Sequence, residues 1–203
     1  MKSPNILIYN EILCDEKENQ LFFVSEYCSA GNLNLYIEQN NNNLTDLQIT
    51  QIFTGIHKGL LTLRENDLIH ADLKPENVLM SSSGNPLIAD FGLAMIFIGK
   101  KKVPASSSSE PNFFMAMEQE VLQKVVPETD YYSAGMLLCK LCGCNDPVEL
   151  FQMKSGVFPQ ISLKNHSELL KLAFSMMGTD PKQRESPKKI LSILESFILT
   201  KEK

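Results

Sequence analysis

The sequence has no apolar run that approaches the roughly 18–20 residues of a membrane-spanning helix. Its start, MKSPNILIYN, lacks a long apolar stretch with a small-residue cleavage site, so we expect no secretory signal peptide. Basic residues are not in excess either: the formal net charge is −5, which provides no positive surface for nucleic acid or an anionic membrane. We therefore expect a cytoplasmic protein without membrane insertion and without a nucleic-acid partner.

Cysteine is scarce and odd in number: the chain has five, which argues against a disulfide framework. Cys139, Cys142 and Cys144 crowd together, so a zinc or redox site is an alternative to consider. However, Cys139 and Cys142 fall in an apolar helical stretch without a nearby histidine, whereas zinc needs a tetrahedral set of ligands. We favour core packing, because free cysteine behaves as a small buried apolar residue.

Strand-like segments lie mostly at the front of the chain. Residues 6–13 and 21–27 have the composition of two short strands joined by a charged turn. Further short apolar pieces lie at 68–69, 78–80 and 87–89, and the Gly-containing turn between the last two predicts a hairpin.

Helical periodicity dominates the rest of the 203 residues. Thr45 followed by Gln48 has the form of a capping box at the start of a long helix. Apolar residues at helical spacing mark its buried face, namely Ile49, Ile52, Phe53, Ile56, Leu60 and Leu63. The other expected helices span 33–39 (weakly), 130–143 and 167–177, and a last one begins at Pro187 after the N-cap Ser186, while 99–112 has the composition of an exposed loop. This order of elements predicts an α+β fold.

The chemistry is concentrated in HADLKPENVLM at 70–80, followed by IADFGLA at 88–94. Asp72, Asn77 and Asp90 are hard oxygen ligands near the ends of short strands, and magnesium is usually held by one or two carboxylates plus phosphates. Lys74 could offset phosphate charge. Alternatively, these are polar turns in which Asp and Asn bond the local backbone. The turn explanation suffices for Asp72 alone, but the joint spacing of both segments favours the magnesium–phosphate site.

These two segments resemble the catalytic and metal-binding loops of eukaryotic Ser/Thr protein kinases. The resemblance covers essentially the whole chain: SPNIL and LFFVSEYCSAGNL resemble the fourth and fifth strands and the hinge, AMEQE the end of the activation segment, and TDYYSAGMLL the central helix of the large lobe. A weaker resemblance, in FVSEYCSAGNLNLYI and LRENDLIHADLKPENVLM, is to the autophagy-initiating kinase subfamily. The family implies a protein kinase-like fold, here with residues 1–27 as the remnant of a β-strand small lobe and 28–203 as a helical large lobe.

The resemblance also implies roles for individual residues. Asp72 would accept or orient the proton of the attacking hydroxyl, Lys74 would contact the transferred phosphate, and Asn77 and Asp90 would hold magnesium on the phosphates of ATP. The adenine would lie against the hinge, with backbone groups of Glu26 and Cys28 at its edge, Leu79 beneath its ring and Ser25 at the rear of the pocket. Arg184 would pair with Glu118 of the activation segment.

The chain departs from the family pattern at several positions. Ala71 replaces the arginine of the usual HRD triplet, so the cationic partner of an activation-loop phosphate is absent and phosphorylation of Ser106–Ser109 is expected to order the loop only weakly. Met117 replaces the proline of APE, and Tyr131–Tyr132 replace an apolar–Trp pair, an exchange that we expect to be neutral for packing.

The largest departure is at the front. The first glycine is Gly31, so no G-x-G-x-x-G loop precedes the hinge, and the only lysines there, Lys2 and Lys17, are not in a VAIK-like strand. Three hypotheses follow: a Ser/Thr kinase recorded without most of its small lobe, a pseudokinase-like module that binds a partner protein, or an incomplete gene model. We favour the kinase, and expect this chain alone to phosphorylate proteins poorly.

Overall fold

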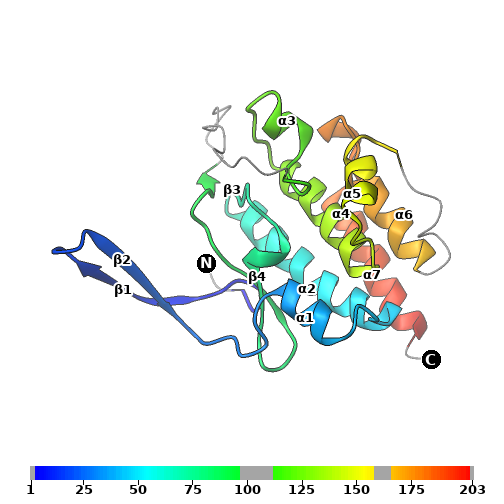
Figure 1. Cartoon of the computed structure of the whole chain (residues 1–203). Helices are drawn as coiled ribbons and strands as arrows, with labels where there is room; N and C mark the ends of the chain where they lie inside the picture. Colours follow the sequence, from blue (N-terminus) through cyan, green and yellow to red (C-terminus); the bar gives the residue numbers. More distant parts are fainter. Residues whose placement is uncertain (1–2, 97–111, 158–165, 202–203) are drawn as a thin grey trace.

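The fold is that of a computed structural model, which describes residues 3–96, 112–157 and 166–201. Two parts are evident in Figure 1: a helical body, and a hairpin that extends away from it on one side. The hairpin consists of β1 (Tyr9–Asp15) and β2 (Gln20–Ser25), paired antiparallel with Leu13 opposite Phe22. The predicted pair of front strands is therefore confirmed.

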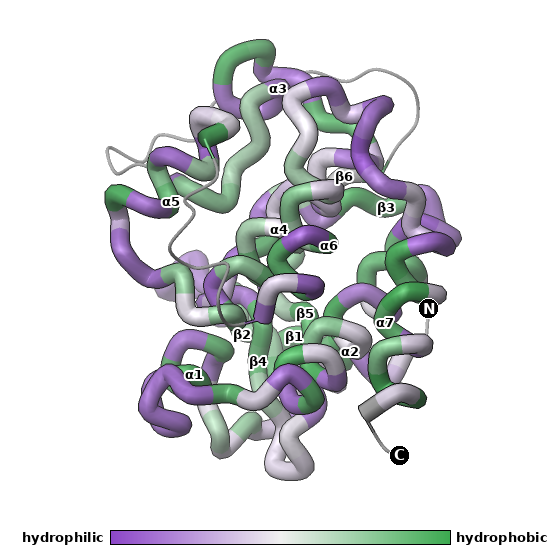
Figure 2. The backbone as a smooth tube through the Cα atoms, turned by 90° about the vertical axis from the view of Figure 1, so that its right-hand side faces the viewer, coloured by the Kyte–Doolittle hydropathy of each residue, from purple (hydrophilic) through white to green (hydrophobic). Residues whose placement is uncertain are grey.

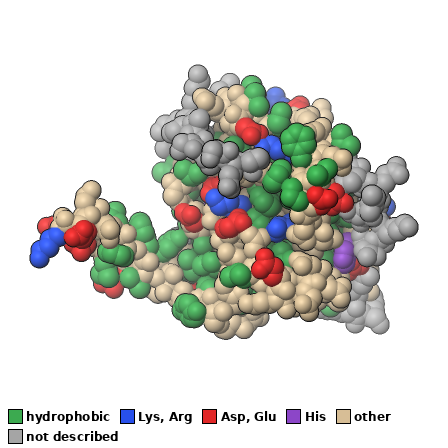
Figure 3. Space-filling view, viewed as in Figure 1, with side chains coloured by type: hydrophobic (Ala, Val, Ile, Leu, Met, Phe, Trp, Pro, Cys, Tyr) green, Lys and Arg blue, Asp and Glu red, His purple; other side chains and the backbone are tan. Residues whose placement is uncertain are grey.

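The first strand begins later than predicted. The sequence-based prediction places Ile6 and Leu7 in this strand, but both are buried in the body, where Ile6 forms a parallel bridge with Ile88 and the Leu7 N–H donates to the Ile88 carbonyl at 2.9 Å. Burial of these two apolar side chains is more favourable than their exposure on the projecting hairpin. From β1 onward both faces of the hairpin are exposed, and its green apolar side chains are visible in Figure 3.

The first long helix of the body is α2 (Asp46–Glu65), preceded by α1 (Leu33–Gln39). The Thr45 side chain accepts the Gln48 N–H while the Gln48 side chain accepts the Thr45 N–H, so the predicted capping box is confirmed. All six residues predicted for the buried face of this helix are buried. The predicted weak helix at 33–39 is also present, and the Asn32 side chain caps it.

Two small strand pairs follow α2. β3 (Leu68–Ile69) pairs antiparallel with β6 (Met95–Ile96), and β4 (Val78–Met80) pairs with β5 (Pro86–Ile88), which confirms the predicted hairpin. The segment 70–77 connects β3 to β4, and the segment 89–94 connects β5 to β6. Both chemically interesting loops are thus anchored at the same end of the body.

The rest of the body is helical. Its elements are α3 (Met117–Glu120), α4 (Thr129–Leu141), α5 (Pro147–Lys154), α6 (Ser167–Met176) and α7 (Pro187–Lys201). α4 lies in the middle of the body with other elements on both sides (Figure 2), and every residue in it except Lys140 is buried. The expectation that the helix after Asp130 is the most buried of the described helices is confirmed.

Close packing against α4 depends on a glycine. A Cβ added to Gly135 would lie 2.6 Å from Met177 Cγ and 2.9 Å from the Ala173 carbonyl oxygen. Cys139 is fully buried in the same core and its thiol lies 3.9 Å from the Met177 sulfur, while Cys142 is also buried. Core packing of these cysteines is therefore confirmed.

The helices predicted at 167–177 and from Pro187 are present as α6 and α7. Sequence reasoning missed α5, although Asp146 caps it and Pro147 occupies its first turn, a recognisable start signal. The predicted exposed loop at 99–112, including Ser106–Ser109, lies outside the described residues except for Asn112. In the described parts of the chain, no helix is both long enough and apolar enough to cross a bilayer.

Candidate active site

Three of the predicted site residues meet on the connection between β3 and β4. Asp72 Oδ2 lies 2.9 Å from Lys74 Nζ and accepts a hydrogen bond from Asn77 Nδ2 at 3.0 Å. Asn77 Nδ2 also donates to the Asp72 backbone carbonyl at 2.8 Å, and Asn77 closes the short 3-10 turn Pro75–Asn77. The asparagine therefore holds both the backbone and the side chain of Asp72 in one orientation.

Asp90 lies just beyond the end of β5, on the adjoining loop. The Ala89 N–H donates to the Asn77 carbonyl at 2.8 Å, which ties the two loops together at this point. Asp90 has a left-handed backbone (φ 60°), and its exposed carboxylate accepts the Gly92 N–H at 3.2 Å. Its own N–H donates to the hydroxyl of Tyr9, a residue of β1 that sequence reasoning did not connect with the site.

Cys28 and Leu79, two of the residues predicted to contact the adenine, lie close to where the hairpin joins the body. Cys28 packs in a small buried cluster with Leu7, Leu87 and Ala89, and the partly buried Leu79 covers the same cluster. Burial, aided by the nearby Glu26 charge, raises the pKa of the Cys28 thiol. The structure therefore brings Cys28 and Leu79 together beside Ala89, the residue before Asp90.

Ser25 and Glu26 form the end of β2 and the start of the connection to the body. The Ser25 hydroxyl donates to the Glu26 carbonyl at 3.1 Å, and the Glu26 side chain is exposed. Cys28 begins the turn that leads to α1, since its carbonyl accepts the Gly31 N–H at 3.0 Å. These contacts fix the course of the chain where it passes from the hairpin to the body.

A buried carboxylate at the start of α4 supports the loop 70–77, which the resemblance predicts to be the catalytic loop. Asp130 accepts the N–H of His70 at 2.7 Å and the N–H of Ala71 at 2.9 Å. Burial raises the pKa of Asp130, against the opposing effects of His70 and of these two N–H bonds. Sequence reasoning gave Asp130 no role, although an acidic residue at the head of an otherwise apolar helix is a detectable signal.

His70 is buried and serves the same loop. A ring nitrogen, Nε2, lies 2.9 Å from the Ala89 carbonyl, and the ring centroid is 5.1 Å from that of Phe91. His70 therefore supports the loop 70–77 from inside the core. The loop that carries Asp90 is thus attached to the loop that carries Asp72 through both a backbone bond and this imidazole.

The activation-segment ion pair is formed as predicted. Arg184 donates to both carboxylate oxygens of Glu118 at 2.7 and 2.8 Å, and the pair is buried. The guanidinium also lies 5.3 Å from the centroid of the Tyr132 ring, whose pKa is raised by burial. Tyr131 is likewise buried, with a pKa raised to about 12, mainly by burial. Neutrality of the two-tyrosine exchange stays a prediction.

A protein kinase domain is defined by this combination of features: a helical body with short strands beside the site, a loop that brings together Asp72, Lys74 and Asn77, and a following Asp-Phe-Gly loop. Comparison with known families agrees, because residues 1–194 match the protein kinase domain family. The chain therefore belongs to the protein kinase family, and the predicted family and fold are confirmed.

The relatives of this chain are named as protein kinases. Mouse serine/threonine-protein kinase Nek2 is 28% identical over 206 residues, which cover 94% of this chain and 46% of Nek2. The rat interferon-induced, double-stranded RNA-activated protein kinase is 25% identical over 187 residues (89% of this chain, 36% of that protein). Arabidopsis thaliana serine/threonine-protein kinase ATG1b is 32% identical over 141 residues (68% and 19%).

These comparisons establish the family at the level of serine/threonine kinases. The chain spans about half the length of the Nek2 proteins that it matches, 46% in mouse and in human. Because the relatives include several Nek kinases as well as ATG1b, the finer subfamily resemblance stays a prediction. Protein kinases as a family use ATP and magnesium.

Proposed function

We propose that this chain is the catalytic part of a Ser/Thr protein kinase, which transfers the γ-phosphate of ATP to Ser or Thr hydroxyls of a protein substrate. The observation that carries the proposal is the grouping of Lys74 and Asn77 around the Asp72 carboxylate, at 2.9 and 3.0 Å. Phosphoryl transfer depends mainly on positioning and charge stabilisation, so a few fixed groups suffice.

Each group has a distinct task in this proposal. Asp72 accepts or orients the proton of the attacking hydroxyl. Lys74 places its ammonium group near the transferred phosphate and offsets its charge. Asn77 uses its amide N–H to hold Asp72, which leaves its side-chain oxygen for other contacts.

The donor set of Asn77 and Asp90 fits magnesium. Magnesium prefers oxygen ligands and is usually bound by one or two carboxylates together with substrate phosphates. The Asn77 side-chain oxygen and the exposed Asp90 carboxylate, which accepts one N–H from Gly92, are oxygens of this kind. When bound, the ion neutralises charge on the phosphates.

The adenine is proposed to lie on the cluster of Cys28 and Leu79, with backbone groups of Glu26 and Cys28 at its edge and Ser25 at its rear. The Glu26 carbonyl accepts a hydrogen bond from the Ser25 hydroxyl, and the Cys28 carbonyl accepts one from the Gly31 N–H. Each carbonyl oxygen keeps a second lone pair that can accept a hydrogen bond from the adenine. The packing of Leu79 against the cluster supports its role beneath the ring.

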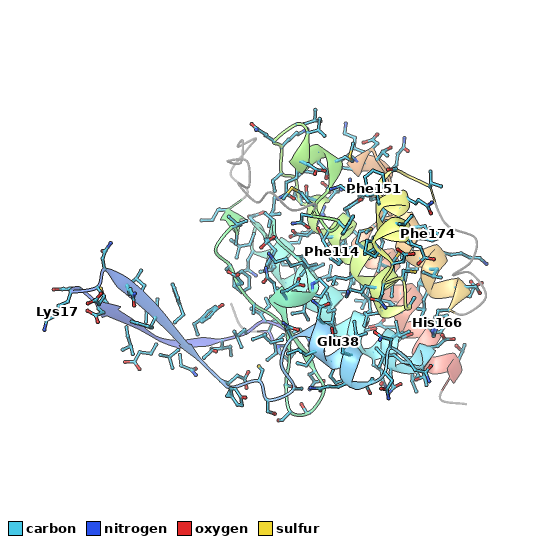
Figure 4. All side chains as sticks on the ribbon, viewed as in Figure 1. Lys17, Glu38, Phe114, Phe151, His166 and Phe174 are labelled. Carbon is cyan, nitrogen blue, oxygen red and sulfur yellow. The ribbon has the colours of Figure 1, made fainter. Side chains whose placement is uncertain are left out.

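The domain division belongs to the same proposal: residues 1–27 form part of a small lobe and 28–203 the large lobe. Exposure of both faces of the hairpin supports completion of this lobe by a further segment or a partner protein. Lys17 lies at the free end of the hairpin (Figure 4), so this lysine is not placed to clamp the phosphates. A cytoplasmic location is part of the proposal.

The test is phosphate transfer by the full-length protein from radiolabelled ATP to a generic Ser/Thr substrate. Asp72→Asn should lower the rate by roughly 10²–10⁴-fold, the usual contribution of a general base. Asp67→Asn is the matched control, because Asp67 is exposed and asparagine tolerates its left-handed backbone (φ 55°). An unchanged rate for Asp72→Asn would reject the assignment.

Calorimetry of magnesium–ATP binding tests the metal ligands separately. Asp90→Asn should weaken binding, and asparagine suits the left-handed backbone at this position. If the folded wild-type protein transfers no phosphate and Asp90→Asn leaves nucleotide binding unchanged, the pseudokinase-like interaction module becomes the better hypothesis. This second candidate is favoured by Ala71, which stands where the family pattern has an arginine, so the catalytic loop lacks that cation.

A further inference from the structure

We propose that Gln119 is a positioning residue of the catalytic loop, whose side-chain amide fixes the peptide unit between Ala71 and Asp72. Its catalytic consequence rests on the proposed function; the contact itself does not. Gln119 lies in α3, is 9% exposed, and donates from Nε2 to the Ala71 carbonyl at 2.6 Å.

The peptide unit in question is held at both of its polar atoms. Its oxygen, the Ala71 carbonyl, accepts from Gln119, and its N–H, that of Asp72, lies 3.3 Å from His70 Nδ1. Rotation of this peptide plane would turn the Asp72 Cα–Cβ bond and so redirect the carboxylate. The two contacts therefore set the direction in which Asp72 leaves the backbone.

Ala71 needs such restraint, because its backbone is left-handed (φ 64°). For a residue with a Cβ this conformation is unfavourable, so neighbouring groups must maintain it. The Asp130 carboxylate holds the N–H of Ala71 and Gln119 holds its carbonyl. One of these partners comes from the central helix α4 and the other from the end of the activation segment.

Gln119 is itself firmly placed. The preceding residue, Glu118, is bound through two oxygens by Arg184, and the Gln119 N–H donates to the Ala116 carbonyl at 3.0 Å. Gln119 also lines one small pocket together with Ala71 and Asp72. A rigid link thus runs from the Glu118–Arg184 pair through Gln119 to the catalytic loop.

This link carries no charge at the catalytic loop. Ala71 presents a methyl group, and an amide donating to a carbonyl does not titrate near neutral pH. We therefore expect the contribution of Gln119 to the orientation of Asp72 to be insensitive to ionic strength, unlike that of Lys74, whose ammonium group lies 2.9 Å from the Asp72 carboxylate.

The test compares Gln119→Met with Gln119→Glu in the full-length protein. Methionine keeps the length and removes the donor, so kcat should fall at least about tenfold with little change in the KM for ATP. In Gln119→Glu the carboxylate faces the Ala71 carbonyl and repels it, so kcat should be equally low near pH 8. As pH falls and the carboxyl group takes up a proton, its O–H can donate, and kcat relative to Gln119→Met should rise.

Gln152→Met and Gln152→Glu are the matched controls, because Gln152 is an exposed residue of the neighbouring helix α5. They should show the kcat and the pH profile of the wild type. A kcat for Gln119→Met within twofold of wild type, or a pH profile for Gln119→Glu parallel to that of Gln119→Met, would overturn the proposal.

Hydrogen exchange separates this proposal from the proposed function. In Gln119→Met, the amides of Ala71 and Asp72 should exchange at least about tenfold faster, with no such change in Gln152→Met. If the wild-type protein transfers no phosphate, the proposed function fails. The exchange result then shows by itself whether Gln119 holds the peptide unit between Ala71 and Asp72. If the wild type is active but exchange at Ala71 and Asp72 is unaltered, the positioning role is wrong.

Discussion

Replacement of Arg184 by methionine removes the cation from the most deeply buried ion pair of the described chain. The side chains of Arg184 and Glu118 are only 1% and 5% exposed. Besides its two bonds to Glu118, Arg184 donates to the carbonyls of Glu128 at 2.8 Å and Gly178 at 2.9 Å. After the substitution, Glu118 keeps the Thr129 hydroxyl at 3.0 Å as its hydrogen-bond partner.

The expected loss is large because a buried charge is left without its counter-ion. Removing one partner of a buried pair typically costs about 3–5 kcal/mol, and a whole domain is stable by only about 5–15 kcal/mol. Glu118→Gln should cost less, about 1.5–3 kcal/mol, the worth of hydrogen bonds to a charged group. Arg184 then keeps its two backbone carbonyls and the face of Tyr132.

The free energy of unfolding is measured by urea denaturation, followed by far-UV circular dichroism, in the full-length protein. Arg64→Met is the control, since the Arg64–Glu128 pair has side chains 39% and 33% exposed and should contribute no more than about 1 kcal/mol. The double variant Glu118→Leu/Arg184→Met removes both charges and should recover part of the loss. A loss below about 1 kcal/mol for Arg184→Met, or no recovery in the double variant, would refute this reasoning.

Three further perturbations test other parts of the structure. Gly135→Ala should cost about 1–3 kcal/mol of stability by overpacking, whereas Gly178→Ala should cost less because an added Cβ there has its nearest contact at 3.6 Å; thermal unfolding compares them. Burial lowers the pKa of His57, so the unfolded chain takes up a proton before the folded one as pH falls below about 6.5. The free energy of unfolding should therefore decrease there by at most about 1.4 kcal/mol per pH unit. His57→Gln should reduce this pH dependence, as measured by denaturation curves at about pH 7.5 and 5.5. Phe22 and Phe23 are 50% and 58% exposed, and exposed apolar side chains on an unpaired hairpin favour association, so Phe22→Ser/Phe23→Ser should reduce self-association of the 203-residue chain, as measured by light scattering. Equal association of the variant and the wild type would contradict this expectation.

Local signals predicted the elements well where neighbouring residues decide them. The capping box at Thr45 and the periodic apolar face after it located α2, because helix starts and amphipathic faces depend on residues within a few positions. The hairpin of β4 and β5 followed from a turn between two apolar segments for the same reason. Ile6 and Leu7 were misassigned because their burial depends on Ile88, far along the chain.

The sequence by itself determined the family and the chemistry available in HADLKPENVLM and IADFGLA. Through the resemblance, it also predicted that Glu118 and Arg184 form an ion pair. What only the tertiary structure decided is how the catalytic loop is held. Asp130 and Gln119 act on His70 and Ala71 across 60 and 48 residues of chain. No local pattern reports such contacts, since a carboxylate or an amide has no fixed sequence distance to its partner, and the packing of α4 and α3 against the loop selects which backbone groups they bind.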